Sequence, residues 1–537
     1  MTLPKNSVSH TINTPLGVLN GISSIDPVSD KIKNHRFAKI PYAQPFSQHN
    51  RWKRPVKLPS NYDYSGNYYE MGLKAPQSSI EDEKLSSICA PGDADENINY
   101  LNIWIPASKD KPVDGWPVFI YIHGGFLKYG SPGRFPDPKE LQSHDFLGKY
   151  IIVSIGYRLN ILGFLNSTEL LSVDSECSNL GFWDQRLAIE WVYDNIKYFE
   201  GNNSKITVGG LSAGSYSTFF QLAYELYHPE VTQVIKQVVQ FSNAFAMQPK
   251  TISEVNKQYY DVLDNLGISR NLSPELQLQQ LREQDVNTLV SIIPKLKYHT
   301  FRAVTDNNFV AESLLSDLVN GQFSQLLMKR KPGFRMVIGE VANEPYLYSL
   351  LDTPIDEMDL KLQLENYYPA RTVQSLIDLY PKIPQSLPEA EYREQLQHLF
   401  GRIVADSQIY ASTRGFIHWL VENGYPKENI FRYRVGYRQK RLDKSVDPKL
   451  GAIHGSDLAV WFSVRSSSEC EKNIIESFLR PFNKILNFED QKSIEWGTLS
   501  EKEYRFISPG GEVNIVSDAD WDWGVHVSNT LYLAQSS

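Results

Sequence analysis

The residues with the most definite chemistry lie around Ser212, which stands in a Gly-x-Ser-x-Gly turn at positions 210–214. An apolar run at 206–208 precedes this turn, and a segment that favours a helix follows it. A strand, a sharp turn and a helix in this order expose the central serine at a helix N-terminus, where N–H groups favour negative charge. The motif alone is also compatible with an ordinary glycine-rich turn, but the flanking pattern favours chemistry. We therefore predict that Ser212 is a nucleophile.

A second turn could stabilise the oxygen that becomes negative when a serine attacks a carbonyl group. Backbone N–H groups are the usual donors in such an oxyanion hole. The sequence His-Gly-Gly-Phe at 123–126 follows an apolar run and comes before Ser212 in the chain, and we interpret His123 as a structural part of this turn. The predicted oxyanion hole has four backbone N–H donors, those of Gly124, Gly125, Phe126 and Ala213.

The elements that must position these turns alternate along the chain. Short apolar runs bounded by turn residues are typical of strands that are buried on both faces. A helical stripe of apolar residues covers 184–199 and ends before Gly201. Strands that alternate with helices predict an α/β fold, in which helices flank a large, mostly parallel central sheet. The strand-like runs are 118–122, 151–155, 206–208, 336–338 and 430–435.

The chain shows no obvious division into separate units. No linker rich in glycine, serine or proline interrupts it, so we expect residues 1–537 to form a single domain. The segment from about 250 to 330 is richer in helix-forming residues and poorer in strand-like runs. We predict that this segment is a helical insertion over the site.

The composition argues against several classes of protein. Lys and Arg number 54 against 62 Asp and Glu, which gives a formal net charge of −8. A mildly acidic chain disfavours nucleic acid or an anionic membrane as the main partner, because both bind clustered basic surfaces. With 41% hydrophobic and 22% charged residues, the chain is typical of globular proteins. No metal-ligand spacing or phosphate-binding loop is visible, so we expect neither a metal nor an organic cofactor.

The same sequence predicts the compartment. The N-terminal residues lack the apolar region of a secretory signal, and no apolar stretch approaches the roughly 20 residues that span a bilayer. Cys89, Cys177 and Cys470 are far apart and are expected to be reduced thiols. We therefore expect a cytoplasmic protein.

Further motifs resemble those of the type-B carboxylesterase/lipase family, which includes cholinesterases and some fungal lipases. Together they cover almost the whole chain. Segment 36–55 is similar to the family's IPYA-x-P region, 100–106 (YLNIWIP) to its LNIW strand, and 179–195 to its NxGxxDQRxALxWVxxNI helix. The resemblance implies an α/β-hydrolase fold and the hydrolysis of small-molecule carboxylic esters through an acyl-enzyme, without a cofactor.

The resemblance also implies two partners for the nucleophile. The family's acid follows a strand in a pattern like Gly-x-x-x-x-Glu-Gly, which residues 339–345 match with the acid at Glu344. Its histidine lies in a Gly-x-x-His-Gly-x-Asp/Glu loop, which residues 451–457 match with His454. The implied catalytic residues are Ser212, Glu344 and His454. Glu340 is the alternative acid, and we expect it to be a surface carboxylate.

Several positions depart from the family pattern. Phe126 replaces the third glycine of the oxyanion turn, and we expect its ring to disfavour bulky acyl or tertiary alcohol groups. Leu211 replaces a common glutamate, which disfavours a cationic, choline-like substrate. Pro345 replaces the glycine after the acid and is expected to change that turn locally. The family's N-terminal disulfide is absent because Ala75 and Ile98 occupy the matching positions, as expected for a reducing compartment.

Several alternatives stay open. Segment 130–138 resembles a stretch of fungal lipases, so a lipase that acts on longer acyl chains is one of them. The acidic segment 81–96 instead favours soluble esters, and we interpret it as a solvated surface loop, with a flap that repels anionic substrates as the alternative. A catalytically inert binding member of the family is a further possibility. Lactones, amides and thioesters need the same machinery, and neither the natural substrate nor the oligomeric state follows from the sequence.

Overall fold

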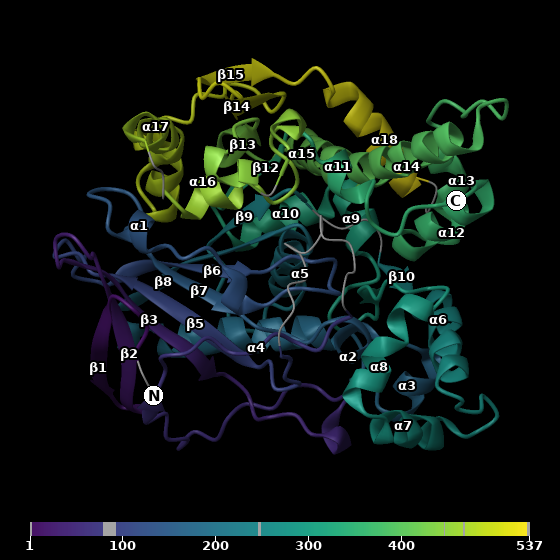
Figure 1. The fold of residues 1–537 in the computed structure, drawn as a ribbon, viewed down its shortest axis with the longest axis horizontal. Helices are drawn as coiled ribbons and strands as arrows, with labels where there is room; N and C mark the ends of the chain where they lie inside the picture. The colour runs from purple at the N-terminus through teal and green to yellow at the C-terminus, as the bar shows by residue number, and fades with distance from the viewer. Residues whose placement is uncertain (1–2, 79–92, 245–248, 445, 465–467, 534–537) are drawn as a thin grey trace.

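A 13-stranded sheet runs through the centre of the molecule (Figure 1). The pairings at the centre of the sheet are parallel, whereas those toward both edges are antiparallel except for a short parallel pairing at residues 66–67. The strands lie side by side in the order β1 (Ser7–Thr14), β2 (Gly17–Ile25), β3 (Ile32–Pro41), β5 (Tyr100–Pro106), β7 (Ile151–Ile155), β6 (Trp116–Ile122), β8 (Gly201–Leu211), β9 (Gln237–Phe241), β12 (Arg335–Val341), β13 (Ile430–Val435), β14 (Glu503–Ile507) and β15 (Val513–Ser517), and β4 (Gly66–Asn67) pairs with β2.

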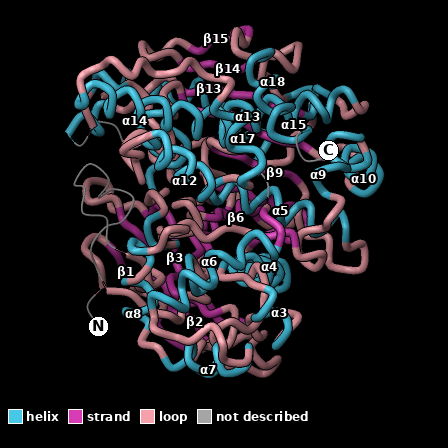
Figure 2. Tube along the Cα trace, turned by 90° about the vertical axis from the view of Figure 1, so that its right-hand side faces the viewer, coloured by secondary structure: helices cyan, strands magenta, loops and turns pink. Residues whose placement is uncertain are grey.

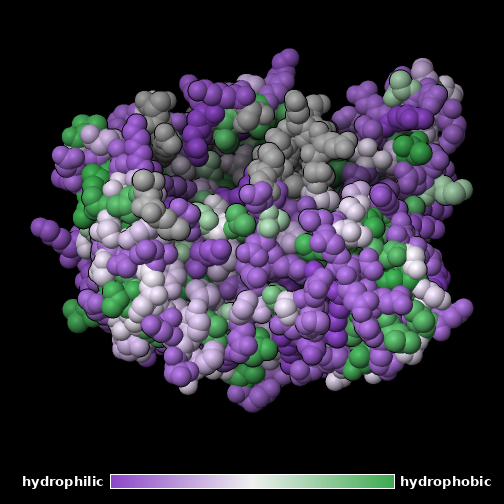
Figure 3. Space-filling model, turned by 60° about the horizontal axis from the view of Figure 1, so that its bottom comes forward, coloured by the Kyte–Doolittle hydropathy of each residue, from purple (hydrophilic) through white to green (hydrophobic). Residues whose placement is uncertain are grey.

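The computed structural model describes residues 3–78, 93–244, 249–444, 446–464 and 468–533. Cys89 and the part of the acidic segment at 81–92 lie outside these ranges. Cys177 is buried and Cys470 is exposed, both as free thiols. Within the described ranges, no helix has the length and apolar character needed to cross a bilayer. The face of the molecule in Figure 3 is mainly hydrophilic, with apolar side chains scattered in small groups.

All five apolar runs of the sequence form strands of this sheet. The runs at 151–155 and 430–435 coincide with β7 and β13, and the other three lie inside β6, β8 and β12. The strands β8 and β12 are longer than their apolar runs because the flanking glycine and polar residues continue the backbone pairing. The prediction of a mostly parallel α/β sheet is therefore confirmed.

Helices cover both faces of the sheet, and alternate residues of β6 pack against different layers. Val118, Ile120 and Ile122 belong to the core under α4 (Leu180–Asn195) and α5 (Ala213–Tyr227). Phe119 and Tyr121 belong to the opposite core, under α16 (Leu458–Phe462) and α17 (Glu469–Leu486). This alternation follows from the two-residue period of a strand. It explains why the run is continuously apolar.

One end of the molecule is mainly helical. Residues 250–330 form five α-helices, a short 3-10 helix and the short strands β10 (Lys250–Thr251) and β11 (Val304–Thr305). Figure 1 places α6, α7 and α8 with α3 at the same end as α12 and α13, and Figure 2 faces this end. The remaining helices are α1 (Lys139–Gln142), α2 (Asn160–Phe164), α3 (Thr168–Val173), α6 (Ile252–Asn265), α7 (Pro274–Glu283), α8 (Val286–Ser291), α9 (Leu314–Asn320), α10 (Gln322–Arg330), α11 (Pro345–Tyr348), α12 (Glu357–Tyr367), α13 (Ala370–Ile377), α14 (Glu389–Ala405), α15 (Ala411–Glu422) and α18 (Trp521–Leu533).

Candidate active site

Ser212 occupies the sharp turn between β8 and α5. Its backbone has φ 56° and ψ −120°, a conformation that side-chain-bearing residues rarely adopt. The Ser212 N–H donates to the carbonyl oxygen of Phe241 at 2.8 Å, which ties the turn to the neighbouring strand β9. A Cβ atom at Gly210 or Gly214 would collide with the backbone carbonyl oxygen of Ile122. Only glycine therefore permits the close approach of α5 to β6 and β8.

Glu344 and His454 lie in direct contact although they are far apart in the sequence. The Glu344 Oε2 atom is 2.5 Å from His454 Nδ1, and both side chains are buried. The other carboxylate oxygen of Glu344 accepts a hydrogen bond from the Val341 N–H at 2.9 Å. Glu344 directly precedes α11, whose first residue is Pro345. Proline suits this position because the first N–H groups of a helix need no partner within it.

The loops that carry these two residues are joined through Asn343. Its N–H donates to the carbonyl oxygen of Ala452 at 3.0 Å, and its side-chain amide donates to that of Leu450 at 3.0 Å. Tyr410 supports the acid from the other side, since its hydroxyl oxygen accepts the Glu344 N–H at 3.2 Å. Tyr410 ends a π-helical turn between α14 and α15. Backbone and side-chain bonds together therefore fix the imidazole relative to the carboxylate.

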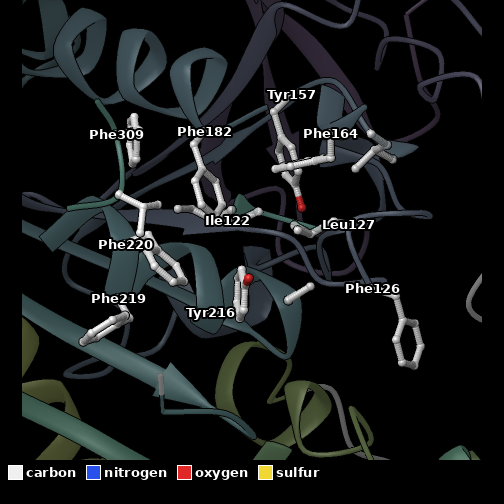
Figure 4. Close-up of a cluster of buried hydrophobic side chains, with 14 of the residues drawn as sticks. Ile122, Phe126, Leu127, Tyr157, Phe164, Phe182, Tyr216, Phe219, Phe220 and Phe309 are labelled. Carbon is white, nitrogen blue, oxygen red and sulfur yellow. The ribbon is translucent and has the colours of Figure 1, made fainter. Parts of the chain in front are cut away.

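The turn at 123–126 packs directly against the serine turn. Gly124 has no room for a side chain, because a Cβ atom there would lie 2.6 Å from the carbonyl oxygen of Leu211. Phe126 has φ 61°, in the region that favours glycine, although it carries a large ring. Figure 4 shows Leu127 and Tyr157 within a cluster of buried side chains and places Phe126 at its edge. Burial lowers the pKa of His123 to about 4, so its ring is neutral at pH 7.

A cavity of about 340 Å³ opens where these segments meet. Ser212, His454 and the turn residues Gly124, Gly125 and Phe126 all line it, and Ala213 is not among the lining residues. The described residues of 250–330 do not line this cavity either. Leu211 adds an apolar wall beside the serine. Within the described ranges, no group of three His, Cys, Asp or Glu side chains is arranged to hold a metal ion.

The expectation that Glu340 is a surface carboxylate is wrong. Glu340 is 1% exposed and pairs with Arg414 at 3.0 Å, and Arg414 also binds Asp518 at 2.9 Å. Arg432 completes this buried group by contacting Asp518 at 2.6 Å. Glu340 lies within β12, so its side chain points to one face of the sheet, whereas Glu344 lies beyond the end of the strand. Burial raises the pKa of Glu340, and the charge of Arg414 opposes this shift.

Asp457 is a second carboxylate close to the histidine. It is fully buried, and its Oδ2 atom accepts from the Trp461 indole N–H at 2.9 Å. Burial raises the pKa of Asp457 to about 6, and the negative charge of Glu344 adds to this effect.

Comparison with known proteins decides the family. Residues 8–518 match the carboxylesterase family. The chain belongs to this family. It is 41% identical over 526 residues to an uncharacterized esterase/lipase of Schizosaccharomyces pombe, with 97% of this chain and 96% of the relative covered. It is 32% identical over 523 residues to a carboxylic ester hydrolase of Gibberella moniliformis, covering 95% and 94% of the two chains. The crystal structure of Aspergillus niger EstA has the same fold, with a TM-score of 0.75, 19% identity and 99% of both chains covered.

The chain is therefore a member of a carboxylic ester hydrolase family, and its fold is that of the α/β-hydrolases. Sequence reasoning assigned no role to Tyr410 and quoted Asp457 only as part of the histidine motif. A signal existed for Asp457, since it stands three residues after His454. None existed for Tyr410, because its distance along the chain hides its contact with the Glu344 backbone.

Proposed function

We propose that the protein is a serine carboxylesterase in which Ser212, His454 and Glu344 act as nucleophile, base and acid. The observation that carries this proposal is the contact of 2.5 Å between Glu344 and His454, together with a cavity lined by both His454 and Ser212. A buried carboxylate on Nδ1 keeps the proton on that nitrogen and leaves Nε2 free to act as a base.

The chemistry then runs in two halves. His454 takes the proton of the Ser212 hydroxyl group as its oxygen attacks the ester carbonyl, and then delivers that proton to the leaving alcohol. Water repeats the attack on the acyl-enzyme and releases the acid. Glu344 stays ionised and stabilises the imidazolium ion that forms in each half.

Backbone N–H groups would stabilise the negative oxygen of the tetrahedral intermediate. The proposed donors are Gly124, Gly125 and Phe126, whose turn packs against the serine, and Ala213 at the start of α5. Each donor in such a hole typically contributes about 100- to 1,000-fold to kcat. The neighbouring side chains are largely apolar, which strengthens these interactions by excluding water.

A p-nitrophenyl ester series from acetyl to palmitoyl tests the proposal. We expect turnover by the wild type and a loss of at least about a thousandfold in kcat for Ser212→Ala, with an unchanged thermal midpoint. A fluorophosphonate probe should label the peptide that contains Ser212. Absence of both turnover and labelling in a folded wild type would support an inert binding protein instead.

A matched pair of carboxylates tests the assignment of the acid. Glu344→Gln should lower kcat about 10⁴-fold, in line with the equivalent change in other triads, and leave folding nearly unaffected. Glu340→Gln should chiefly lower stability, because that side chain pairs with Arg414. The reverse pattern would show that Glu340 is the acid.

In the ester series, a preference for the longest acyl chains at concentrations above their solubility limit would favour a lipase.

A further inference from the structure

A second cavity, of about 190 Å³, lies behind the turn that carries Glu344. Asn343 and Pro345, on either side of Glu344 in the chain, both line this rear cavity. Tyr410, whose hydroxyl oxygen accepts the Glu344 N–H, lines it too. The Glu344 carboxylate instead contacts His454, a lining residue of the catalytic cavity. The described residues that line the two cavities are different sets, so the rear cavity is a separate site.

Arg434 is a partly buried cation on the wall of the rear cavity. It stands directly opposite Glu340 in the pairing of β12 with β13. Both carboxylate oxygens of Glu340 are already bonded to Arg414, at 3.0 and 3.2 Å. Among the described residues, no carboxylate lies within ion-pair distance of the Arg434 guanidinium, which donates to the neutral hydroxyl group of Tyr504 at 3.4 Å.

The charges around Arg434 do not balance. Arg414 also binds Asp518 at 2.9 Å, and Arg432 binds the same carboxylate at 2.6 Å. Within the described part of the chain, this group therefore holds three guanidinium groups but only two carboxylates, those of Glu340 and Asp518. The excess charge is that of Arg434, because both carboxylates are bonded to the other two guanidinium groups. A partly buried charge without a partner favours the binding of an anion.

The other charged groups of the described lining are already compensated. Arg402 pairs with Asp406 at 2.8 Å. Asp406 also accepts a hydrogen bond from the Tyr380 hydroxyl group at 2.9 Å. Asp520 directly precedes α18, whose first N–H groups favour a negative charge. Arg434 is therefore the charged group of this lining that can serve a bound anion.

The remaining walls of the rear cavity are aromatic and apolar. The ring centroid of Tyr410 lies 5.8 Å from the guanidinium carbon of Arg434. Trp523 supplies a second ring, and Ala411 and Val527 add aliphatic surface. Such a lining accommodates an apolar molecule with a single charged end beside the guanidinium.

We infer that the rear cavity binds a small monocarboxylic acid with an aromatic or apolar body, whose carboxylate pairs with Arg434. A planar guanidinium matches the two oxygens of a carboxylate. The bound acid also contacts Tyr410 and Asn343, which hold the loops of the catalytic acid and the histidine in place. Binding should therefore change kcat rather than KM, and this consequence rests on the proposed function.

Calorimetric titration of the full chain with benzoate tests the site without relying on catalysis. Benzoate has an aromatic body and one carboxylate, and benzamide has nearly the same shape without the charge. We expect benzoate to bind the wild type and to bind Arg434→Gln roughly 10- to 100-fold more weakly, since a charged hydrogen-bond partner is lost. Benzamide should bind the wild type at least about tenfold more weakly than benzoate does.

A matched variant controls for binding in the other cavity. Arg134 lines the catalytic cavity, so Arg134→Gln removes an arginine there and leaves the rear cavity intact. This variant should bind benzoate like the wild type. Weaker binding by Arg134→Gln together with unchanged binding by Arg434→Gln would place benzoate in the catalytic cavity and overturn the proposal.

Kinetics of p-nitrophenyl valerate in the presence of benzoate tests the link to the triad. We expect benzoate to change the kcat of the wild type and to leave KM unchanged. The same concentration should have no effect on the kcat of Arg434→Gln. A rise in KM that is equal in both proteins would indicate competition for the catalytic cavity and contradict the proposal. Binding without any change in kcat would refute the link to the triad.

Two further results would overturn the proposal: no benzoate binding to the wild type at millimolar concentration, or equal binding of benzoate and benzamide. If Arg434→Gln has a lowered thermal midpoint, the comparison of benzoate with benzamide tests the charge in the wild type alone. Absence of valerate turnover in the wild type would count against the proposed function while leaving the titration valid.

Discussion

Phe126 offers a quantitative test of how the oxyanion turn shapes the cavity. Its ring is 7% exposed and lies edge-on to Tyr348 and Tyr367, with centroids 5.8 and 6.5 Å away. Its φ of 61° is costly for any residue with a Cβ atom. We therefore compare Phe126→Gly, which removes both the ring and the strain, with Phe126→Ala, which removes only the ring.

The two effects have opposite signs for stability. Loss of a buried phenylalanine ring costs about 3–5 kcal/mol. Phe126→Gly relieves about 1 kcal/mol of backbone strain, which remains in Phe126→Ala. We therefore expect both variants to be less stable than the wild type, with Phe126→Gly about 1 kcal/mol more stable than Phe126→Ala. Urea denaturation at pH 7 measures the difference.

The effect on specificity should be the same in both variants. Phe126 lines the catalytic cavity, so its removal makes room beside the reacting carbonyl group. A steric contact of one or two carbons is worth about 1–3 kcal/mol in a pocket. The ratio of kcat/KM for p-nitrophenyl pivalate to that for the acetate should therefore rise at least about tenfold. An unchanged ratio would refute the steric argument, and equal stability of the two variants would refute the strain argument.

Three further changes test other parts of the structure. Arg414→Met leaves Glu340 buried without its partner and leaves Asp518 with Arg432 alone, so it should cost about 3–5 kcal/mol of unfolding free energy in urea; a loss below about 1 kcal/mol would contradict the buried network. Asp457 has a folded-state pKa of about 6, above its unfolded value, so it binds a proton more tightly in the folded state and its contribution to stability falls as pH rises from about 4 to 6. The free energy of unfolding of Asp457→Asn should not fall in this way. Relative to that of the wild type, it should therefore rise by up to about 3 kcal/mol between pH 4 and pH 7. A constant difference between the two proteins across that range would argue against a raised pKa of Asp457. Tyr410→Phe removes the acceptor of the Glu344 N–H and should lower kcat about tenfold with little change in KM, while a selective rise in KM would point to a role in binding.

Local features of this protein could be read from its sequence because short-range sterics determine them. The continuous apolar run at 118–122 predicted a strand buried on both faces, and β6 does pack against two cores. The glycines around Ser212 predicted a tight strand-to-helix turn, and the structure leaves no space for side chains at either position. In each case the information lies within a few residues, where periodicity and backbone conformation act.

Contacts between distant segments depended on the tertiary structure. Both Glu340 and Glu344 were candidates for the acid in the sequence, yet only the path of the chain beyond β12 places Glu344 against His454 and leaves Glu340 with Arg414. The buried network of Arg414 and Arg432 with Glu340 and Asp518 left no pattern in the sequence. Long-range charges and hydroxyl groups meet through the packing of whole elements, which neither spacing nor composition encodes. The sequence by itself therefore determined the elements and the reactive turn, and the packing of those elements decided which side chains face one another.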